Sequence, residues 1–534
     1  MSEHRELDLH DVQGNIIKAY PRFGYPRARY VFFRINDGQA ARNFLSDLLP
    51  LVTTSSPWQR EGNAVDGSAR PQVATNVALT FEGLRRLGVP QAPLQTFPEE
   101  FASGMQTRRT ILGDDGPSAP ENWDPIWTEP DRVHVFVALN AGTPEQIEHC
   151  YETVLALSSK QPGGVVLLGG HRGPGGAVLD YQDASAIFIG DEATPREHFG
   201  YVDGISNPFF KGAMSDSSHV VGGGKVAKSI LHGTLGWEPL ETGEFLLGYP
   251  DEAFEYPAAP IPNLLGDNGT YLVYRKLHQN VGSFEAYLNR ASASYAGGRE
   301  MLAAKLAGRW RNGAPLTNFP TEAAANEFAE KWTAAKLAVA NAQTPLERIA
   351  AKVKLALVSK DFVDFDYRKD LDGGRCPVGA HARRVHPRAA LEGGQSGAFE
   401  RPDSLANRRR ILRRGMPYGD SRDRADDAGE HGVVFMALGV DISRQFEFVQ
   451  QQWINYGNDF RLANDKDPLL GNHGKTASGE PDGRFTIESG KDDPNPPHFC
   501  SGIPRFVETR GGEYFFVPSL TALRMLADGI VDPT

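Results

Sequence analysis

Residues 132–157, RVHVFVALNAGTPEQIEHCYETVLAL, contain the pattern that decides the fold. The apolar run His134–Val137 predicts a strand, and Thr143 followed by Pro144 supplies an N-cap and a proline at the first helical position. Glu145 adds acidic charge to the first turn, where it interacts favourably with the helix dipole. The stretch is therefore predicted to form one strand followed by one helix.

Three other segments repeat this order of a short apolar run, a polar turn and a helical stretch. They are Arg29–Leu49, Thr270–Leu288 and Gly432–Trp453. Two of the four units precede residue 215 and two follow it, which predicts a duplicated α+β plan. Each half is expected to build a sheet that is covered by helices.

A stretch rich in glycine and serine, residues 212–224, is interpreted as the linker between the halves. The predicted domains are an N-terminal half, residues 1–215, and a C-terminal half, residues 216–534. Within the second half, Arg299–Val358 is dominated by Ala, Leu, Lys, Glu and Arg, which predicts inserted helices bounded by Pro320 and Pro345.

The composition excludes several classes of protein. The 534 residues carry 56 Lys and Arg against 67 Asp and Glu, a net charge of −11, which argues against contact with nucleic-acid phosphates or acidic lipids. The three cysteines lie far apart in the sequence and predict no disulfide framework. No apolar run suits a signal peptide or a membrane span, so a cytoplasmic location is expected.

The first segment with possible chemistry is residues 198–208, HFGYVDGISNP, in which two glycines bracket Asp203. Gly200 and Gly204 would let the backbone approach a flat or bulky group closely, and the carboxylate would then be held against that group. The alternative is an Asp-Gly turn, in which Asp203 hydrogen-bonds to its own backbone.

Two basic segments follow. Residues 375–388, RCPVGAHARRVHPR, place His381 ahead of a cluster of arginines, and residues 408–419, RRRILRRGMPYG, join further arginines to a Gly/Pro turn. A histidine suits iron, and a guanidinium can clamp an anionic group. The alternatives are a structural histidine and a solvated basic face.

Taken together, these three segments resemble the motifs of the dye-decolorizing peroxidase family. Residues 198–208 are similar to its distal-aspartate motif, residues 376–388 to its proximal-histidine motif and residues 411–419 to its distal-arginine motif. Weaker similarities extend across nearly the whole chain. The resemblance implies two ferredoxin-like halves, with antiparallel sheets and helices packed outside, and one haem b per chain held mainly by the second half.

The resemblance also implies a role for each residue. His381 would be the axial ligand of the haem iron, and Arg388 would meet a haem propionate. Asp203 would exchange a proton with hydrogen peroxide, while Arg413 would favour the charged form of Asp203 and stabilise negative charge as the O–O bond breaks. Gly200 and Gly204 would allow the cofactor to approach.

Three assignments have alternatives. Asp441 is expected to accept a hydrogen bond from the second ring nitrogen of His381, although it could equally be a helix N-cap. His386 could compete with His381 as the iron ligand. Arg414 adjoins Arg413, so the distal arginine could be misplaced by one residue.

The function expected from this reading is a haem peroxidase that uses hydrogen peroxide to oxidise phenolic or dye-like one-electron donors. A haem-binding or haem-handling protein without fast peroxide turnover is the alternative, and a non-catalytic interaction module is a third. A carrier has no need of an acid–base carboxylate and an arginine, so Asp203 and Arg413 together favour the enzyme. The sequence does not specify the oligomeric state.

Overall fold

The computed structural model describes residues 6–58, 69–213, 220–227, 236–391, 404–420, 427–491 and 493–531. Of the expected linker, residues 214–219 lie outside this set. Within the described ranges, no helix is both long enough and apolar enough to cross a membrane. The cytoplasmic location and the division of the chain at residue 215 stay predictions.

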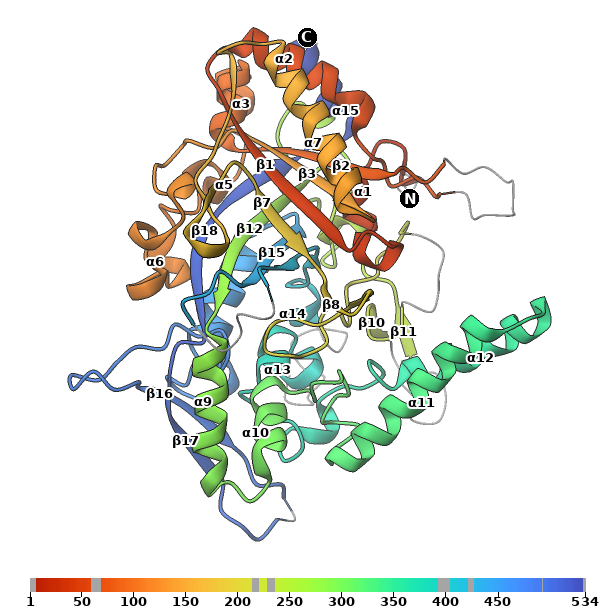
Figure 1. The fold of residues 1–534 in the computed structure, drawn as a ribbon, viewed down its shortest axis with the longest axis vertical. Coiled ribbons are helices and arrows are strands. Elements are labelled where there is room, and N and C mark those ends of the chain that lie inside the picture. Colours follow the sequence, from red (N-terminus) through yellow and green to blue (C-terminus); the bar gives the residue numbers. More distant parts are fainter. Residues whose placement is uncertain are drawn as a thin grey trace.

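One antiparallel sheet of ten strands runs through the molecule (Figure 1). Its main path is β13-β15-β12-β18-β2-β3-β1-β4, with β14 beside β15 and β7 beside β1. The strands are β1 (Arg27–Ile35), β2 (Val73–Leu79), β3 (Val135–Ala141), β4 (Val165–Leu167), β7 (Gln182–Ser185), β12 (Thr270–Gln279), β13 (Leu412–Arg413), β14 (Met416–Tyr418), β15 (Gly432–Gly439) and β18 (Val507–Val517).

The sheet joins strands from the two halves of the sequence. Strand β18 meets β2 through the pair Phe516 and Leu79, and all other pairings of the main path lie within one half. Aromatic rings pack across the boundary, with 5.4 Å between the ring centres of Phe32 and Tyr274. The two halves therefore share one hydrophobic core, and the predicted α+β fold class with ferredoxin-like halves is confirmed.

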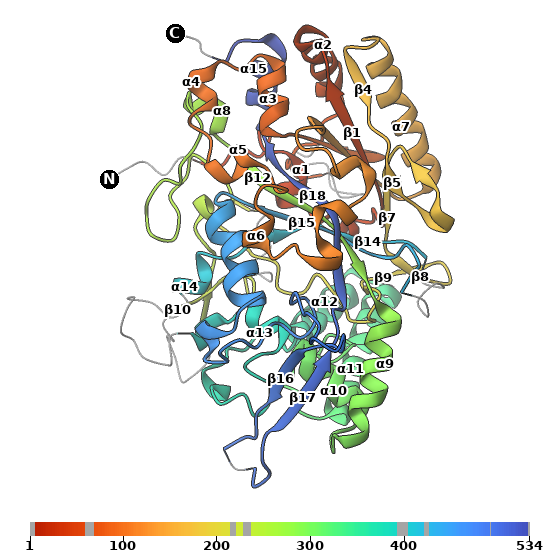
Figure 2. The same ribbon diagram turned by 90° about the vertical axis from the view of Figure 1, so that its left-hand side faces the viewer.

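Helices cover the sheet in both halves (Figure 2). The principal ones are α2 (Gly38–Leu48), α3 (Phe81–Leu87), α7 (Pro144–Ser159), α9 (Val281–Ala291) and α15 (Leu520–Asp528). Helix α7 begins with a capping box between Thr143 and Gln146, with Pro144 in its first turn, as the sequence predicts. All four predicted strand–helix units are present.

The helix of the fourth unit differs from the prediction. Residues 443–454 form π-helical turns, in which the N–H of Phe448 bonds to the carbonyl of Ser443. The predicted spacing of apolar residues assumed the narrower α-helix. Wide turns of this kind occur often at functional sites, and Phe446 and Val449 border the cavity described below.

The helical region expected at Arg299–Val358 is also present. It contains α10 (Gly298–Ala307), α11 (Glu322–Asn341) and α12 (Pro345–Lys360), and the last two extend away from the rest of the chain (Figure 1). The remaining short elements are α1 (Gly14–Ile17), α4 (Gln91–Leu94), α5 (Glu99–Ser103), α6 (Arg109–Leu112), α8 (Asn263–Gly266), α13 (His381–Val385), α14 (Ser404–Asn407), β5 (His171–Arg172), β6 (Val178–Leu179), β8 (Ile187–Ile189), β9 (Glu192–Thr194), β10 (Lys225–Ala227), β11 (Gly236–Glu238), β16 (Gly483–Ile487) and β17 (His498–Ile503).

Candidate active site

A cavity of about 490 Å³ brings the three sequence motifs together. His381 borders it from α13, Arg413 from β13, and Asp203 from the loop that follows β9. Much of the wall is apolar, formed by Ala307, Val385, Phe446, Val449, Ile454 and Leu469. Its size and its mixture of apolar walls with a few convergent polar groups are typical of small-molecule sites.

His381 is held by a buried carboxylate. Its Nδ1 lies 2.9 Å from Oδ2 of Asp467, whose side chain has no solvent exposure. The other carboxylate oxygen, Oδ1, accepts the N–H groups of Leu469 and Leu470, each at 2.9 Å. Asp467 therefore fixes the orientation of the imidazole ring through Nδ1. Nε2, the second ring nitrogen of this cavity-lining residue, takes no part in that contact.

This contact also sets the charges of both groups. Burial by itself opposes charge on each, but the interaction between them outweighs it. The pKa of Asp467 is therefore held below its ordinary value by His381, and the pKa of His381 is raised by Asp467.

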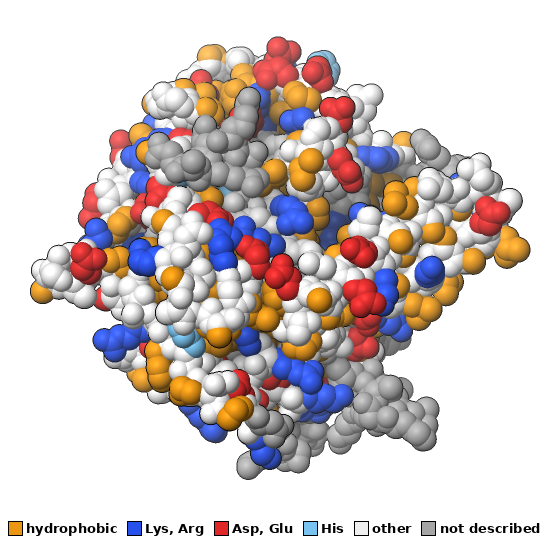
Figure 3. All heavy atoms as spheres, turned by 60° about the horizontal axis from the view of Figure 1, so that its bottom comes forward, with side chains coloured by type: hydrophobic (Ala, Val, Ile, Leu, Met, Phe, Trp, Pro, Cys, Tyr) orange, Lys and Arg blue, Asp and Glu red, His pale blue; other side chains and the backbone are white. Residues whose placement is uncertain are grey.

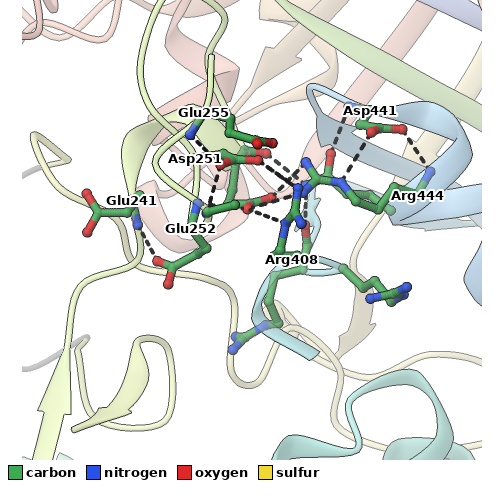
Figure 4. Close-up of polar contacts among 12 residues, drawn as sticks. Glu241, Asp251, Glu252, Glu255, Arg408, Asp441 and Arg444 are labelled. Atoms are coloured by element: carbon green, nitrogen blue, oxygen red, sulfur yellow. Dashed lines mark hydrogen bonds and ion pairs between the residues drawn. The ribbon is translucent and has the colours of Figure 1, made fainter. Parts of the chain in front are cut away.

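The expectation that Asp441 is the partner of His381 is wrong. Oδ1 of Asp441 accepts the N–H of Arg444 at 2.8 Å, and Oδ2 lies 3.2 Å from the Arg444 guanidinium. Figure 4 shows this carboxylate in a charged network with Arg408 and Asp251, among others. A carboxylate at a strand-to-helix turn lies next to unpaired N–H groups, so the capping alternative applies.

Asp203 and Arg413 form the predicted pair. Nη1 of Arg413 donates to Oδ1 of Asp203 at 3.0 Å, and the N–H of Gly204 donates to the same oxygen at 2.5 Å. Nη2 of Arg413 donates to the carbonyl of Ile205 at 2.6 Å, while its backbone N–H donates to Oδ1 of Asn207 at 3.0 Å. Asp203 thus has both the backbone hydrogen bond of an Asp-Gly turn and an ion pair with Arg413.

The two glycines of this motif have different positions. Both have a positive φ, +93° for Gly200 and +76° for Gly204. Gly204 borders the cavity, but Gly200 does not and instead turns the chain through contacts with Arg196 and Glu197. Gly200 therefore serves the turn, and its part in the approach of a cofactor stays a prediction.

Arg413 and Arg414 are distinguished by their partners. Nη2 of Arg414 donates to the carbonyl of Ile16 at 2.7 Å and Nη1 to the carbonyl of Arg413 at 2.8 Å. Its guanidinium is thus committed to backbone carbonyls, including that of Asn15. Of the two, Arg413 is the residue whose guanidinium reaches Asp203.

Arg388 and His386 also border the cavity. Arg388 is buried, and its guanidinium donates to the carbonyls of Val363 and Phe365 and lies 4.0 Å from the centre of the Phe365 ring. Burial, with the positive charges of Arg410 and Arg388, lowers the pKa of His386 well below its ordinary value. The cavity therefore has an electropositive region that suits an anionic group.

Sequence reasoning missed several residues of the site. Asp467 is 86 positions from His381, and no motif spacing connects the two. Arg309 lines the cavity from the start of the inserted region, and Arg22 reaches it from the N-terminal half, where its guanidinium donates to the carbonyl of Gly204. Only their positions in the folded chain identify them.

Comparisons with known proteins find relatives along nearly the whole chain. The family described as the DyP dimeric alpha+beta barrel domain matches residues 11–172. The chain is 29% identical to a multifunctional dye peroxidase from Amycolatopsis sp. over 97% of its own length and 96% of that protein. It is 26% identical to a dye-decolorizing peroxidase from Mycetinis scorodonius over 97% and 87% of the two chains.

Solved structures give the same result. An ancestral D-type dye-decolorizing peroxidase is 26% identical and superimposes with a TM-score of 0.69 over 97% of this chain and 99% of that one. A DyP-type peroxidase from Auricularia auricula-judae is 25% identical, with a TM-score of 0.67 over 98% and 100% of the two chains. The family model, the curated relatives and the solved structures thus all indicate a dye-decolorizing-type peroxidase, which is an oxidoreductase.

Proposed function

We propose that the protein is a haem-dependent peroxidase that reduces hydrogen peroxide and oxidises phenolic or dye-like one-electron donors. The observation that carries the proposal is the meeting of His381, fixed by Asp467, with the Asp203–Arg413 pair at one cavity. Each cavity-lining residue of this set has a use in peroxide chemistry. A haem carrier would need only the first part of the arrangement.

The residues around the cavity suit haem b at one per chain. Apolar side chains can cover the faces of the macrocycle, and Nε2 of His381 can bind iron while Nδ1 donates to a carboxylate, the usual arrangement for a metal-bound histidine. Arg388 and its basic neighbours can meet the propionates. Haem supplies, when bound, a redox-active iron that exchanges electrons with peroxide and with the donors.

Asp467 does its work through His381. By accepting the hydrogen bond from Nδ1, the buried carboxylate fixes the tautomer and increases the electron density of the imidazole. His386 borders the same cavity but, among the described residues, has no carboxylate partner comparable to Asp467. This difference supports His381 as the iron ligand.

Asp203 and Arg413 act on peroxide. The carboxylate of Asp203 can accept a proton from hydrogen peroxide and return it to the oxygen that leaves as water. Arg413 holds the carboxylate in place and can stabilise the negative charge that develops as the O–O bond breaks. The pair's partial exposure is consistent with access for a small substrate from the cavity.

A haem titration tests the proposed ligand directly. We expect haem b to saturate the apoprotein at one equivalent, with the absorbance spectrum of histidine-ligated haem. His381→Ala should abolish this spectrum, and His386→Ala, as the matched control, should keep it. Loss of the spectrum in His386→Ala alone would reject His381 as the ligand.

A further inference from the structure

The helical pair α11–α12 forms an arm that the described residues of this chain stabilise on one side. Trp332 of α11 packs against Phe362, with 5.2 Å between ring centres, and its Nε1 donates to Oγ of Ser359 at 3.1 Å. Helix α12 begins with a capping box in which Thr344 and Glu347 exchange hydrogen bonds. The arm is thus a folded pair of helices with internal packing and a capped second helix.

The outer face of α12 carries an apolar stripe. No residue of this helix, all of which is described, is buried. Leu346, Ile349, Val353 and Leu357 are 77%, 60%, 55% and 59% exposed. Their spacing of three, four and four residues places them on one face, and Figure 3 shows hydrophobic side chains along the arm. Contiguous exposed apolar surface of this kind marks an interaction site.

Charged residues border the stripe. Lys352 lies on one side of the stripe. Glu347 and Lys354 lie together on the other side, because these two residues are seven positions, or about two helical turns, apart. Oε2 of Glu347 is occupied by the N–H groups of Gln343 and Thr344, and Oε1 takes no donor among the described residues. One border therefore presents a positive and a negative charge at its two ends.

We propose that α12 pairs antiparallel with α12 of a second copy of this chain, around a twofold axis near residues 351 and 352. Such an axis places Leu346 opposite the partner's Leu357 and Ile349 opposite the partner's Val353, so the stripe covers itself. It also places Glu347 near the partner's Lys354, and the contact is repeated by symmetry. The stripe and its charged border are thus complementary to themselves.

Other arrangements match the stripe less well. A parallel pair would set each border against the partner's opposite border, and this would place Lys354 beside the partner's Lys352 in two like-charge contacts. The antiparallel pair brings Lys352 of the two copies close together, but at the solvated border. A lysine-bordered apolar helix could also lie on an anionic lipid surface. The reciprocal charge contact favours the second copy, and the lipid surface becomes an outcome of the test.

Sedimentation velocity of the full haem-loaded chain tests the interface. We expect the wild type to sediment as a dimer and Ile349→Glu/Val353→Glu to sediment as a monomer with unchanged haem absorbance. The matched control Val178→Glu/Ile189→Glu alters two side chains that are each 68% exposed elsewhere and should stay dimeric. A monomeric wild type, or a dimer that survives the α12 substitutions, would overturn the proposal. Binding of the monomer to phosphatidylglycerol vesicles would assign the stripe to lipid instead.

Cross-linking tests the direction of pairing. Leu346→Cys and Leu357→Cys are prepared separately, mixed, and treated with a short bifunctional maleimide. The antiparallel dimer should cross-link in the mixture, whereas each variant alone should not, because its cysteines lie about 16 Å apart along the helix axes. The wild type, with Cys376 and Cys500 buried, is the blank. Cross-linking of each variant alone would show parallel pairing and contradict the proposal.

Discussion

Nδ1 of His381 and Oδ2 of Asp467 lie 2.9 Å apart, although 86 residues separate them in the sequence. The carboxylate is fully buried and is held by two backbone N–H groups, so it cannot turn away from the imidazole. A metal-bound histidine with such a partner is a stronger electron donor. This contact therefore connects a loop remote in sequence to the chemistry of the cavity.

The first prediction concerns the charge of this partner. Asp467→Asn keeps the shape of the side chain but removes its charge, so the haem-loaded variant should have a more positive reduction potential and bind haem roughly 10-fold to 100-fold more weakly. A spectroscopic redox titration and a haem-transfer assay measure the two effects. Asp441→Asn is the matched control and should leave both unchanged. An equal response of the two variants would mean that Asp467 has no special role.

The second prediction separates peroxide chemistry from haem retention. Asp203→Asn and Arg413→Leu should keep a normal haem content, because neither side chain is proposed to hold the cofactor. Each should slow the reaction with hydrogen peroxide by about 100-fold or more, since each loses proton transfer or charge stabilisation. Stopped-flow absorbance measures the rate. Normal rates in both variants would reject the site, and a normal rate in one would show that its residue is dispensable.

The third prediction concerns the electropositive region of the cavity. Arg388→Met removes a buried guanidinium that borders the cavity, so haem should dissociate roughly 10-fold to 100-fold faster, as expected for loss of a charged hydrogen bond. Transfer of haem to a scavenger protein measures this rate. Arg388→Lys should recover part of the retention. An unchanged rate in Arg388→Met would exclude contact between this residue and the propionates.

The fourth prediction is a pH dependence of stability. Burial raises the pKa of Glu244 to about 7, despite the nearby guanidinium of Arg444. The folded state therefore keeps a proton that the unfolded state releases near pH 4.5. As the pH rises from about 4.5 to 7, the free energy of unfolding should fall by up to about 3 kcal/mol.

Urea unfolding of the apoprotein at pH 5 and 7.5 measures this effect. On going from pH 5 to pH 7.5, the free energy of unfolding should decrease less in Glu244→Gln than in the wild type. Burial also raises the pKa of Glu488 and of Glu513 to about 7, so part of the dependence should remain in the variant. Identical pH dependence in the two proteins would show that Glu244 does not titrate as described.

Local patterns in the sequence predicted much of the fold. The strand–helix units could be predicted because apolar runs, N-caps and prolines act within a few residues, as Thr143 and Pro144 do at α7. The π-helical turns of residues 443–454 could not, because their apolar spacing is also that of an α-helix. The pairing of β18 with β2 joins segments from opposite ends of the chain and has no local signal.

The site divides in the same way. His381, Asp203 and Arg413 were predicted because each lies within a compact motif, and the fold brings all three to one cavity. Asp467 was missed because its role depends on tertiary packing alone. Asp441 was assigned wrongly because its position next to a strand end was taken to place it next to His381. Its carboxylate instead caps a helix.

Rapid mixing of the haem-loaded protein with one equivalent of hydrogen peroxide tests the proposed peroxidase activity most directly. We predict prompt loss of the ferric Soret band, followed by its return when a phenolic donor is added, with the loss about 100-fold slower in Asp203→Asn. A ferric spectrum that does not respond to peroxide would contradict the proposed peroxidase and favour haem carriage.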